Sequence, residues 1–408
     1  MKQAIIFLAL MAAGCSNLSL PLNLMESTPK QFQSRQIIVT LSEDIRSQWQ
    51  AINQEILDRF DVQAAGEFPL KSIRVDCLVY RVSEMVDIDE IMLRLSVDKR
   101  IELVQLNQVF DGLQGNNSYT YKKLSYGPKM IRADLAHAAA TGKGITVAVI
   151  DTGADEEHPD LKGHIIAAQN FVEGGAASFA KDKHGTAVAG VIGARDNNGI
   201  GIDGIAPDAN IDIYKACWYV ENDDGKALCS SWTLAKAIDA AITKGSQIIN
   251  LSLSGPEDTL LKKLLVSAHQ HHIVLVAAAM ENSSEAGFPA SLDFVIPVIS
   301  ADPQGEIAYP PWKTKLQVIA APGVEILTTA PGDGYNFLSG SSLAAAHVSG
   351  VVALILQHQP RLEPDAVRVV LKQTSHHKTS NQPESNRFSV LLDACLALVD
   401  IGAKIVCP

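Results

Sequence analysis

The chain lacks an excess of positive charge. Its 408 residues carry 34 lysines and arginines against 45 aspartates and glutamates, which gives a formal net charge of −11. Proteins that bind nucleic acid neutralise phosphates with clustered Lys and Arg side chains. No basic block interrupts this sequence, so we expect no nucleic-acid partner.

Long apolar runs are lacking as well. The run from Ala4 to Ala13 follows Lys2 and is too short to cross a bilayer as a helix. The rest of the sequence shows no second membrane segment, no internal repeat and no low-complexity tract. With 47% apolar and 19% charged residues, the composition is that of a globular protein with a sizeable core, and the length suggests two domains behind a leader.

The N-terminal run ends in Leu10-Met-Ala-Ala-Gly-Cys15, with small residues directly before a cysteine. This pattern resembles a bacterial lipoprotein signal, in which a peptidase cuts before the cysteine and the thiol carries lipid. An ordinary secretory leader with a chance cysteine is the alternative. Ser16 after Cys15 resembles the outer-membrane sorting pattern of diderm bacteria. The expected location is therefore the cell envelope, with a lipid anchor on Cys15 and, in a diderm, attachment to the outer membrane.

Five cysteines follow Cys15. Export makes disulfides permissible, but the sequence does not give the geometry that a bridge needs. Pairing between near neighbours would leave one cysteine alone: Cys217 with Cys229, Cys395 with Cys407, and Cys77 unpaired.

Changes in composition divide the chain into five parts. These are a signal peptide at 1–14, a tether at 15–35, a compact domain at 36–110, a linker at 111–126 and a larger domain at 127–408. The linker is rich in Gly and Asn and has no apolar period, which predicts an exposed segment open to proteolysis.

The compact domain alternates strands with helices. β-rich runs predict strands at 37–41, 72–82 and 101–109, and apolar residues at helical spacing predict helices around 49–60 and 88–95. This order indicates a small α+β sandwich of ferredoxin-like type.

The larger domain alternates short apolar strands with alanine-rich helices. The strands are expected at 145–150, 211–214, 248–252 and 273–277. Near-continuous apolar strands separated by helices indicate an α/β fold whose parallel sheet is covered on both faces. Ligands and catalytic groups collect at the carboxyl ends of such strands.

Three polar residues stand where this chemistry is expected. Asp151 follows the strand at 145–150, His184 opens a small-residue helix, and Ser342 opens a long apolar helix. A hydroxyl becomes a useful nucleophile when an imidazole removes its proton, and a buried carboxylate fixes the imidazole's tautomer. Each residue alone is a weak signal, but the order Asp, His, Ser is specific. A lipase or esterase would place Ser first, within a Gly-x-Ser-x-Gly elbow that is absent here.

The sequence around these residues resembles the subtilisin family of serine peptidases (subtilases). Val149-Ile-Asp-Thr-Gly153 resembles its aspartate motif, His184-Gly-Thr-Ala-Val-Ala-Gly190 its histidine motif, and Gly340-Ser-Ser-Leu-Ala-Ala-Ala-His347 its serine motif. The resemblance covers roughly 133–374. It implies a three-layer parallel sheet of subtilisin type.

The resemblance also implies a serine endopeptidase. Ser342 would form an acyl-enzyme, with His184 as general base and Asp151 orienting it. Polypeptide substrates would add as a strand to an edge segment made of Ser252, Leu253, Ser254 and Gly255. The domain at 36–110 resembles the family's inhibitory propeptide, and self-cleavage between about 111 and 125 would separate the protease from its lipid anchor.

No cofactor is expected from the sequence. The sequence does not decide whether a structural calcium ion binds, and the acidic run at 221–224 is interpreted as solvated surface.

One position departs from the family pattern. The family usually reads Ala-Ala-Gly-Asn where this chain reads Ala277-Ala-Ala-Met-Glu-Asn282, and the family's asparagine donates to the oxyanion. Counting from the alanines puts Glu281 in that place, whereas a shift of one residue would let Asn282 donate. Loss of this donor costs about 10²–10³ in turnover in subtilisin, and we apply that figure by analogy. The alternative function is therefore a catalytically impaired lipoprotein of this fold that binds peptides or partners.

Overall fold

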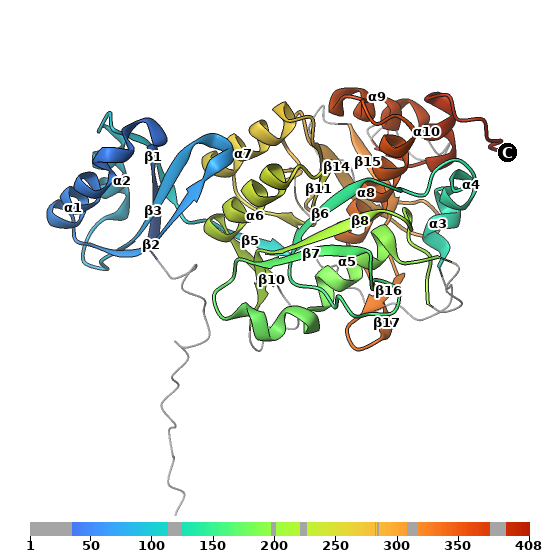
Figure 1. Ribbon diagram of the computed structural model, residues 1–408, viewed down its shortest axis with the longest axis horizontal. Coiled ribbons are helices and arrows are strands. Elements are labelled where there is room, and N and C mark those ends of the chain that lie inside the picture. Colours follow the sequence, from blue (N-terminus) through green and yellow to red (C-terminus); the bar gives the residue numbers. More distant parts are fainter. Residues whose placement is uncertain are drawn as a thin grey trace, which may run out of the picture.

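Figure 1 shows the computed structural model of the chain. The structure describes residues 35–112, 125–196, 201–220, 227–281, 283, 285–307, 317–375 and 389–408. Several sequence predictions fall largely or wholly outside these residues: the signal with Cys15, the tether at 15–35, the linker at 111–126, the acidic run at 221–224 and Asn282. A small N-terminal domain, blue in Figure 1, packs beside a larger domain that runs from green to red.

The small domain is an antiparallel sheet with two helices on one face. Its strand order is β2-β3-β1-β4. The elements are β1 (Gln36–Ser42), α1 (Trp49–Arg59), β2 (Val62–Leu70), β3 (Val75–Val82), α2 (Ile88–Ser96) and β4 (Ile101–Leu106), with short 3-10 helices at Glu43–Gln48 and Lys71–Ile73. Apolar residues of both helices pack with one face of the sheet, which confirms the expected ferredoxin-like arrangement. The sequence analysis missed β2, because its Val-Gln-Ala-Ala-Gly-Glu run has few β-branched residues.

The expectation of one strand over 101–109 is wrong. The chain makes β4, breaks at Asn107 and Gln108, and then forms β5 (Val109–Gly112). The Asn107 side chain bonds Gln36 on one side and the backbone N–H of Trp232 on the other, and the N–H of Gln108 donates to Ser231. These contacts redirect the chain from the small sheet to the larger domain.

The larger domain is built on an eight-stranded sheet in which every described strand pairing is parallel. In spatial order its strands are β18 (Ser389–Leu391), β15 (Val318–Pro322), β14 (Ile296–Ala301), β13 (Val274–Ala278), β11 (Ile248–Leu251), β6 (Thr146–Asp151), β8 (Asn210–Lys215) and β7 (Ile165–Asn170). The four predicted strands are found as β6, β8, β11 and β13. The α/β fold with a parallel sheet is therefore confirmed.

Helices cover both faces of this sheet (Figure 1). One face carries α3 (Tyr126–Met130), α4 (Ala133–Ala136), α5 (Lys183–Gly193), α8 (Ser341–His358), α9 (Pro364–Thr374) and α10 (Ala394–Asp400). The other face carries α6 (Ser231–Lys244) and α7 (Thr259–Gln270), which also contact the small domain. A 3-10 helix at Gly175–Lys181 precedes α5. Among the described helices, α8 is long and apolar enough to cross a membrane, but 89% of it is buried, as expected of a central core helix.

Two small sheets complete the larger domain. β16 (Ile326–Ala330) pairs with β17 (Gly334–Leu338), and β9 (Cys217–Tyr219) pairs with β10 (Ala227–Ser230). Disulfides join Cys217 to Cys229 and Cys395 to Cys407. Cys77 is buried on β3 as a free thiol. This is the pairing between near neighbours along the chain that the sequence allowed.

Candidate active site

Asp151 and His184 form a buried pair at the carboxyl edge of the large sheet. Asp151 is the last residue of β6, and His184 lies in the first turn of α5. Nδ1 of His184 lies 2.7 Å from Oδ1 of Asp151. A carboxylate can only accept, so Nδ1 carries the proton and Nε2 of the neutral ring is left as the basic nitrogen.

Close backbone packing fixes the two segments that carry this pair. The N–H of Gly185 donates to Oγ1 of Thr152 at 2.9 Å. A Cβ on Gly185 would come within 2.5 Å of the Gly153 carbonyl oxygen, so glycine is required for this approach. The end of β6 and the start of α5 are therefore held in one register.

A buried ion pair also contacts the segments that carry Asp151 and His184. Nζ of Lys215, at the end of β8, lies 2.5 Å from Oδ2 of Asp182, and this oxygen also accepts the N–H of Gly153 at 2.9 Å. Burial raises the pKa of the Asp182 carboxyl, and the Lys215 ammonium offsets part of that increase. The sequence analysis missed both residues, although a lysine directly after a buried strand is a signal worth following.

Ser342 lies in the first turn of α8, which packs against α5 on the same face of the sheet. Its hydroxyl donates to the carbonyl of Ser252 at 3.2 Å, and the hydroxyl of Ser252 donates back to the carbonyl of Ser342 at 3.1 Å. The side-chain NH₂ of Asn250 donates to the hydroxyl of Ser252 at 2.9 Å, and its oxygen accepts the hydroxyl of Ser349, in α8, at 2.8 Å. These reciprocal bonds fix the start of α8 against the segment that follows β11.

Glu281 is anchored beside the same helix. Its Oε1 accepts the hydroxyl of Ser300 at 2.5 Å and the hydroxyl of Ser341 at 2.6 Å. Ser341 directly precedes Ser342, and its hydroxyl also accepts the N–H of Ser300 at 3.1 Å. The Glu281 carboxylate thus connects the segment after β13 to the first residue of α8.

The expected substrate-binding edge carries a strand of the chain itself. β12 (Leu253–Ser254) pairs antiparallel with β5, so that Leu253 faces Gly112 and Ser254 faces Asp111. The other edge of β5 pairs with β10. β5 therefore lies between β10 and β12. Gly255 pairs instead with Phe288.

Residues 142–389 match the profile of the Subtilase family. The chain belongs to the subtilase family.

The relatives of this subtilase are serine proteases. It is 33% identical over 301 residues to the thermophilic serine proteinase of Bacillus sp. (strain AK1), across 72% of this chain and 73% of that protein. It is 38% identical over 249 residues to the major intracellular serine protease of Bacillus subtilis (strain 168), across 58% of this chain and 76% of the relative. This subtilase is thus a serine endopeptidase, and the comparisons do not favour the non-catalytic alternative.

A solved structure supports the fold of this subtilase. Fervidolysin from Fervidobacterium pennivorans, described as related to subtilisin, superposes with a TM-score of 0.70 at 24% identity. The match covers 90% of this chain and 61% of the fervidolysin chain.

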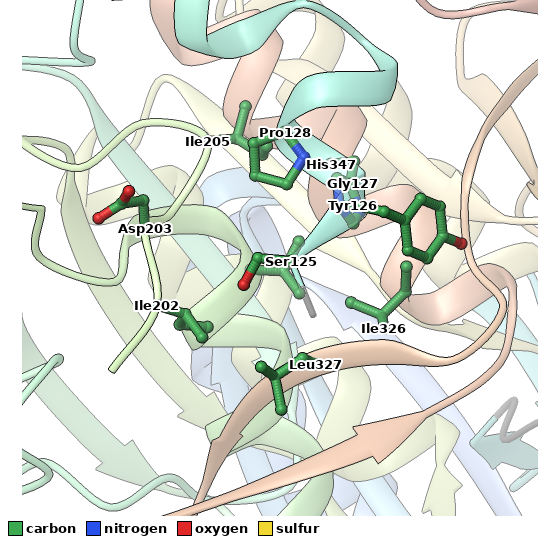
Figure 2. Close-up of a pocket in the computed structure, with 11 residues that line it drawn as sticks. Ser125, Tyr126, Gly127, Pro128, Ile202, Asp203, Ile205, Ile326, Leu327 and His347 are labelled. Atoms are coloured by element: carbon green, nitrogen blue, oxygen red, sulfur yellow. The ribbon is translucent and has the colours of Figure 1, made fainter. Parts of the chain in front are cut away.

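The second histidine of the subtilase motifs, His347, belongs to the core. Its Nδ1 donates to the carbonyl of Leu343 at 2.8 Å, and complete burial lowers the pKa of the ring to about 4. Figure 2 shows it among the residues that line a small pocket, together with Tyr126, Gly127 and Ile326. The volume of this pocket is about 20 Å³. A Cβ on Gly127 would come within 2.4 Å of Nε2 of His347. The ring therefore packs the start of the larger domain against α8, in a cavity separate from the Asp151–His184 pair.

The described residues of this subtilase include no cluster of three or more His, Cys, Asp or Glu side chains placed to hold a metal ion.

Proposed function

We propose that this subtilase hydrolyses peptide bonds through an acyl-enzyme on Ser342, with His184 as general base and Asp151 orienting it. The bond of 2.7 Å between Asp151 and Nδ1 of His184 is the observation that carries the proposal. It keeps the proton on Nδ1, so Nε2 can take the serine proton, and it supports the imidazolium that forms. Ser342 also lies at the N-terminus of α8, where the helix dipole favours developing negative charge.

Polypeptide substrates are proposed to bind in extended form between β10 and β12, contacting the segment from Ser252 to Gly255. The pairing of β5 with both strands supports this, because main-chain bonds of this kind give affinity without requiring one side-chain sequence.

The N-terminal domain is proposed to be an inhibitory propeptide. Its strand β5 fills the position that a substrate would take. The side chain of Gln105 donates to both carboxylate oxygens of Asp258 at 2.8 Å and accepts the N–H of Leu260, in the first turn of α7, at 2.8 Å. The ring of Phe68 stacks on Trp232 of α6 with centroids 5.8 Å apart. Polar and apolar contacts together fix this domain over the substrate position.

Helix α6 also forms hydrogen bonds with the small domain. The Asp239 carboxylate of α6 accepts the backbone N–H groups of Lys71 and Ser72 at 3.2 and 2.8 Å. The small domain thus bonds both helices on this face of the sheet.

Two alternatives for the oxyanion donor remain proposals. We place Glu281 in the position of the family's asparagine, where its bonds to Ser300 and Ser341 support a role in anchoring α8. The backbone N–H of Ser342 then supplies the donation to the oxyanion. In the alternative, Asn282 supplies a side-chain donor.

The protein is proposed to be a lipoprotein of the cell envelope, anchored through Cys15. This anchor precedes the inhibitory domain in the chain, so cleavage after that domain would release the protease from its covalent tether.

A fluorophosphonate probe tests the central proposal. The wild-type protein should be labelled on Ser342, and Ser342→Ala should not be labelled. Absence of labelling in folded wild-type protein from which the N-terminal domain has been removed would contradict the proposed nucleophile.

A further inference from the structure

Tyr219 contacts the segments that carry both members of the Asp151–His184 pair. Its hydroxyl accepts the backbone N–H of His184 at 2.7 Å, and the phenol lies close enough to Asp151 and to Thr152, directly after it, for both residues to act on its pKa. Burial raises the pKa of this phenol, so the hydroxyl stays neutral and accepts the His184 bond as an uncharged group. One side chain is therefore bonded to the first turn of α5 and lies beside the end of β6.

The first turn of α5 needs such a partner. The first N–H groups of a helix have no acceptor within the helix, and the side chain of the N-cap residue usually supplies one. Here the N-cap residue is Asp182, whose side chain makes no capping bond. Its carboxylate bonds Lys215 and the N–H of Gly153 instead. The phenol of Tyr219 takes over part of the capping role from outside the helix.

Tyr219 comes from the sheet that binds the extended strand. It ends β9, and β9 pairs antiparallel with β10, one of the two neighbours of β5. Cys217 faces Cys229 across this pair, and a disulfide joins them. The disulfide thus ties the strand that carries Tyr219 to a wall of the peptide position.

We propose that Tyr219 is a positioning residue for the Asp151–His184 pair, and that the Cys217–Cys229 disulfide holds it in place. This inference rests on the proposed function, in which His184 is the base. The phenol keeps the first turn of α5 in register with the end of β6. The imidazole of His184 therefore keeps its orientation when a bound peptide pairs with β10. The disulfide then contributes to catalysis indirectly. Its reduction lowers turnover although neither cysteine contacts a reacting group.

The first test is Tyr219→Phe, which removes only the hydroxyl. Turnover is measured on two substrates with the self-processed enzyme. One is p-nitrophenyl acetate, which is too small to reach β10 or β12, and the other is succinyl-Ala-Ala-Pro-Phe-p-nitroanilide. Loss of one hydrogen bond predicts a fall in kcat of about 3- to 10-fold on both, with KM changed less than about twofold. Tyr214→Phe is the matched control, since Tyr214 is a buried tyrosine of β8; it should leave kcat unchanged.

The second test removes the disulfide by Cys217→Ser with Cys229→Ser. The same fall in kcat is expected, and adding Tyr219→Phe should produce little further loss, because coupled residues are not additive. Cys395→Ser with Cys407→Ser removes a disulfide of the same sequence separation, 12 residues, and should leave kcat unchanged.

Three results would overturn the inference: an unchanged kcat in Tyr219→Phe, a loss confined to the peptide substrate, or full additivity with the disulfide variant. A loss on the peptide alone would place Tyr219 in substrate binding instead of positioning. Failure of the proposed function looks different, because the wild-type enzyme itself would then turn over neither substrate and would not react with the fluorophosphonate.

Discussion

The ammonium of Lys215 lies 2.5 Å from the carboxylate of Asp182, two residues before His184 in the chain, and both side chains are buried. This ion pair supports the segment that carries His184, the proposed general base. The Asp182 carboxylate also accepts the backbone N–H of Gly153.

Replacing Lys215 by Met should therefore destabilise the fold strongly. The change leaves the Asp182 carboxylate buried without its partner, and breaking a buried pair in this way costs about 3–5 kcal/mol. Denaturant unfolding in the Ser342→Ala background, which prevents self-digestion, measures the effect. Adding Asp182→Asn should restore most of the loss. If the single and double variants are equally unstable, the ion pair is not the cause.

His347 should make the protein less stable in acid. Its pKa is about 4 in the folded protein and about 6.5 in an unfolded chain. The unfolded state therefore binds more protons between these values. The stabilisation is complete above about pH 6.5 and is lost as the pH falls towards 4, a total of about 3 kcal/mol. Unfolding of Ser342→Ala at pH 7.5, 6, 5 and 4 measures it. His347→Leu should show a shallower dependence, and an equal slope in both proteins would assign the effect to other groups.

Glu281→Gln should raise turnover. The amide keeps an oxygen for the hydroxyls of Ser300 and Ser341, and its NH₂ group adds a donor that a carboxylate lacks. An oxyanion donor is worth about 10²–10³ in turnover, so a rise in kcat of at least about tenfold is expected. The control is Asn282→Ala, which should leave kcat unchanged. A loss of activity in Asn282→Ala, with no gain in Glu281→Gln, would identify Asn282 as the donor.

The register of β5 predicts where self-cleavage occurs. Leu253 faces Gly112, so a peptide that continued this register by one residue would set its next carbonyl opposite Ser252, the residue that bonds Ser342. We expect cleavage after Leu113, and N-terminal sequencing of the mature enzyme should begin at Gln114. Ser342→Ala should remain at full length. A first residue other than Gln114 in freshly processed protein would contradict this register.

Cell fractionation tests the proposed anchor. Wild-type protease should appear partly in the soluble fraction, whereas Ser342→Ala should stay with the membranes, because it cannot cut itself away from Cys15. Cys15→Ser in the inactive background should be soluble if the lipid is the anchor. Identical fractionation of wild type and Ser342→Ala would contradict release by self-cleavage.

The sequence predicted the parallel sheet well because its strands are buried on both faces and read as unbroken apolar runs, as in Thr146–Asp151. It also indicated where Asp151, His184 and Ser342 lie relative to strands and helices, since each stands at the boundary of a strong pattern. The resemblance to a family supplied their roles.

Other features could not be predicted because they depend on contacts between distant segments. Tyr219 meets His184 across 35 positions of the chain, and nothing in the local pattern of Cys-Trp-Tyr marks its hydroxyl. The break between β4 and β5 has the same origin. Residues 101–106 and 109 favour a strand, Asn107 interrupts the pattern, and bonds that Asn107 and Gln108 make with the larger domain stand at the break.

The strand β5 has a consequence for when the protease can act. While it belongs to the same chain, its local concentration at the position between β10 and β12 is fixed, and dilution does not reduce its occupancy. The proposed cleavage would turn this contact into an encounter between two molecules, one of them held at the lipid surface by the proposed anchor. Under this proposal, diffusion of the protease into a larger volume would free the site, and distance from the membrane would set the onset of proteolysis.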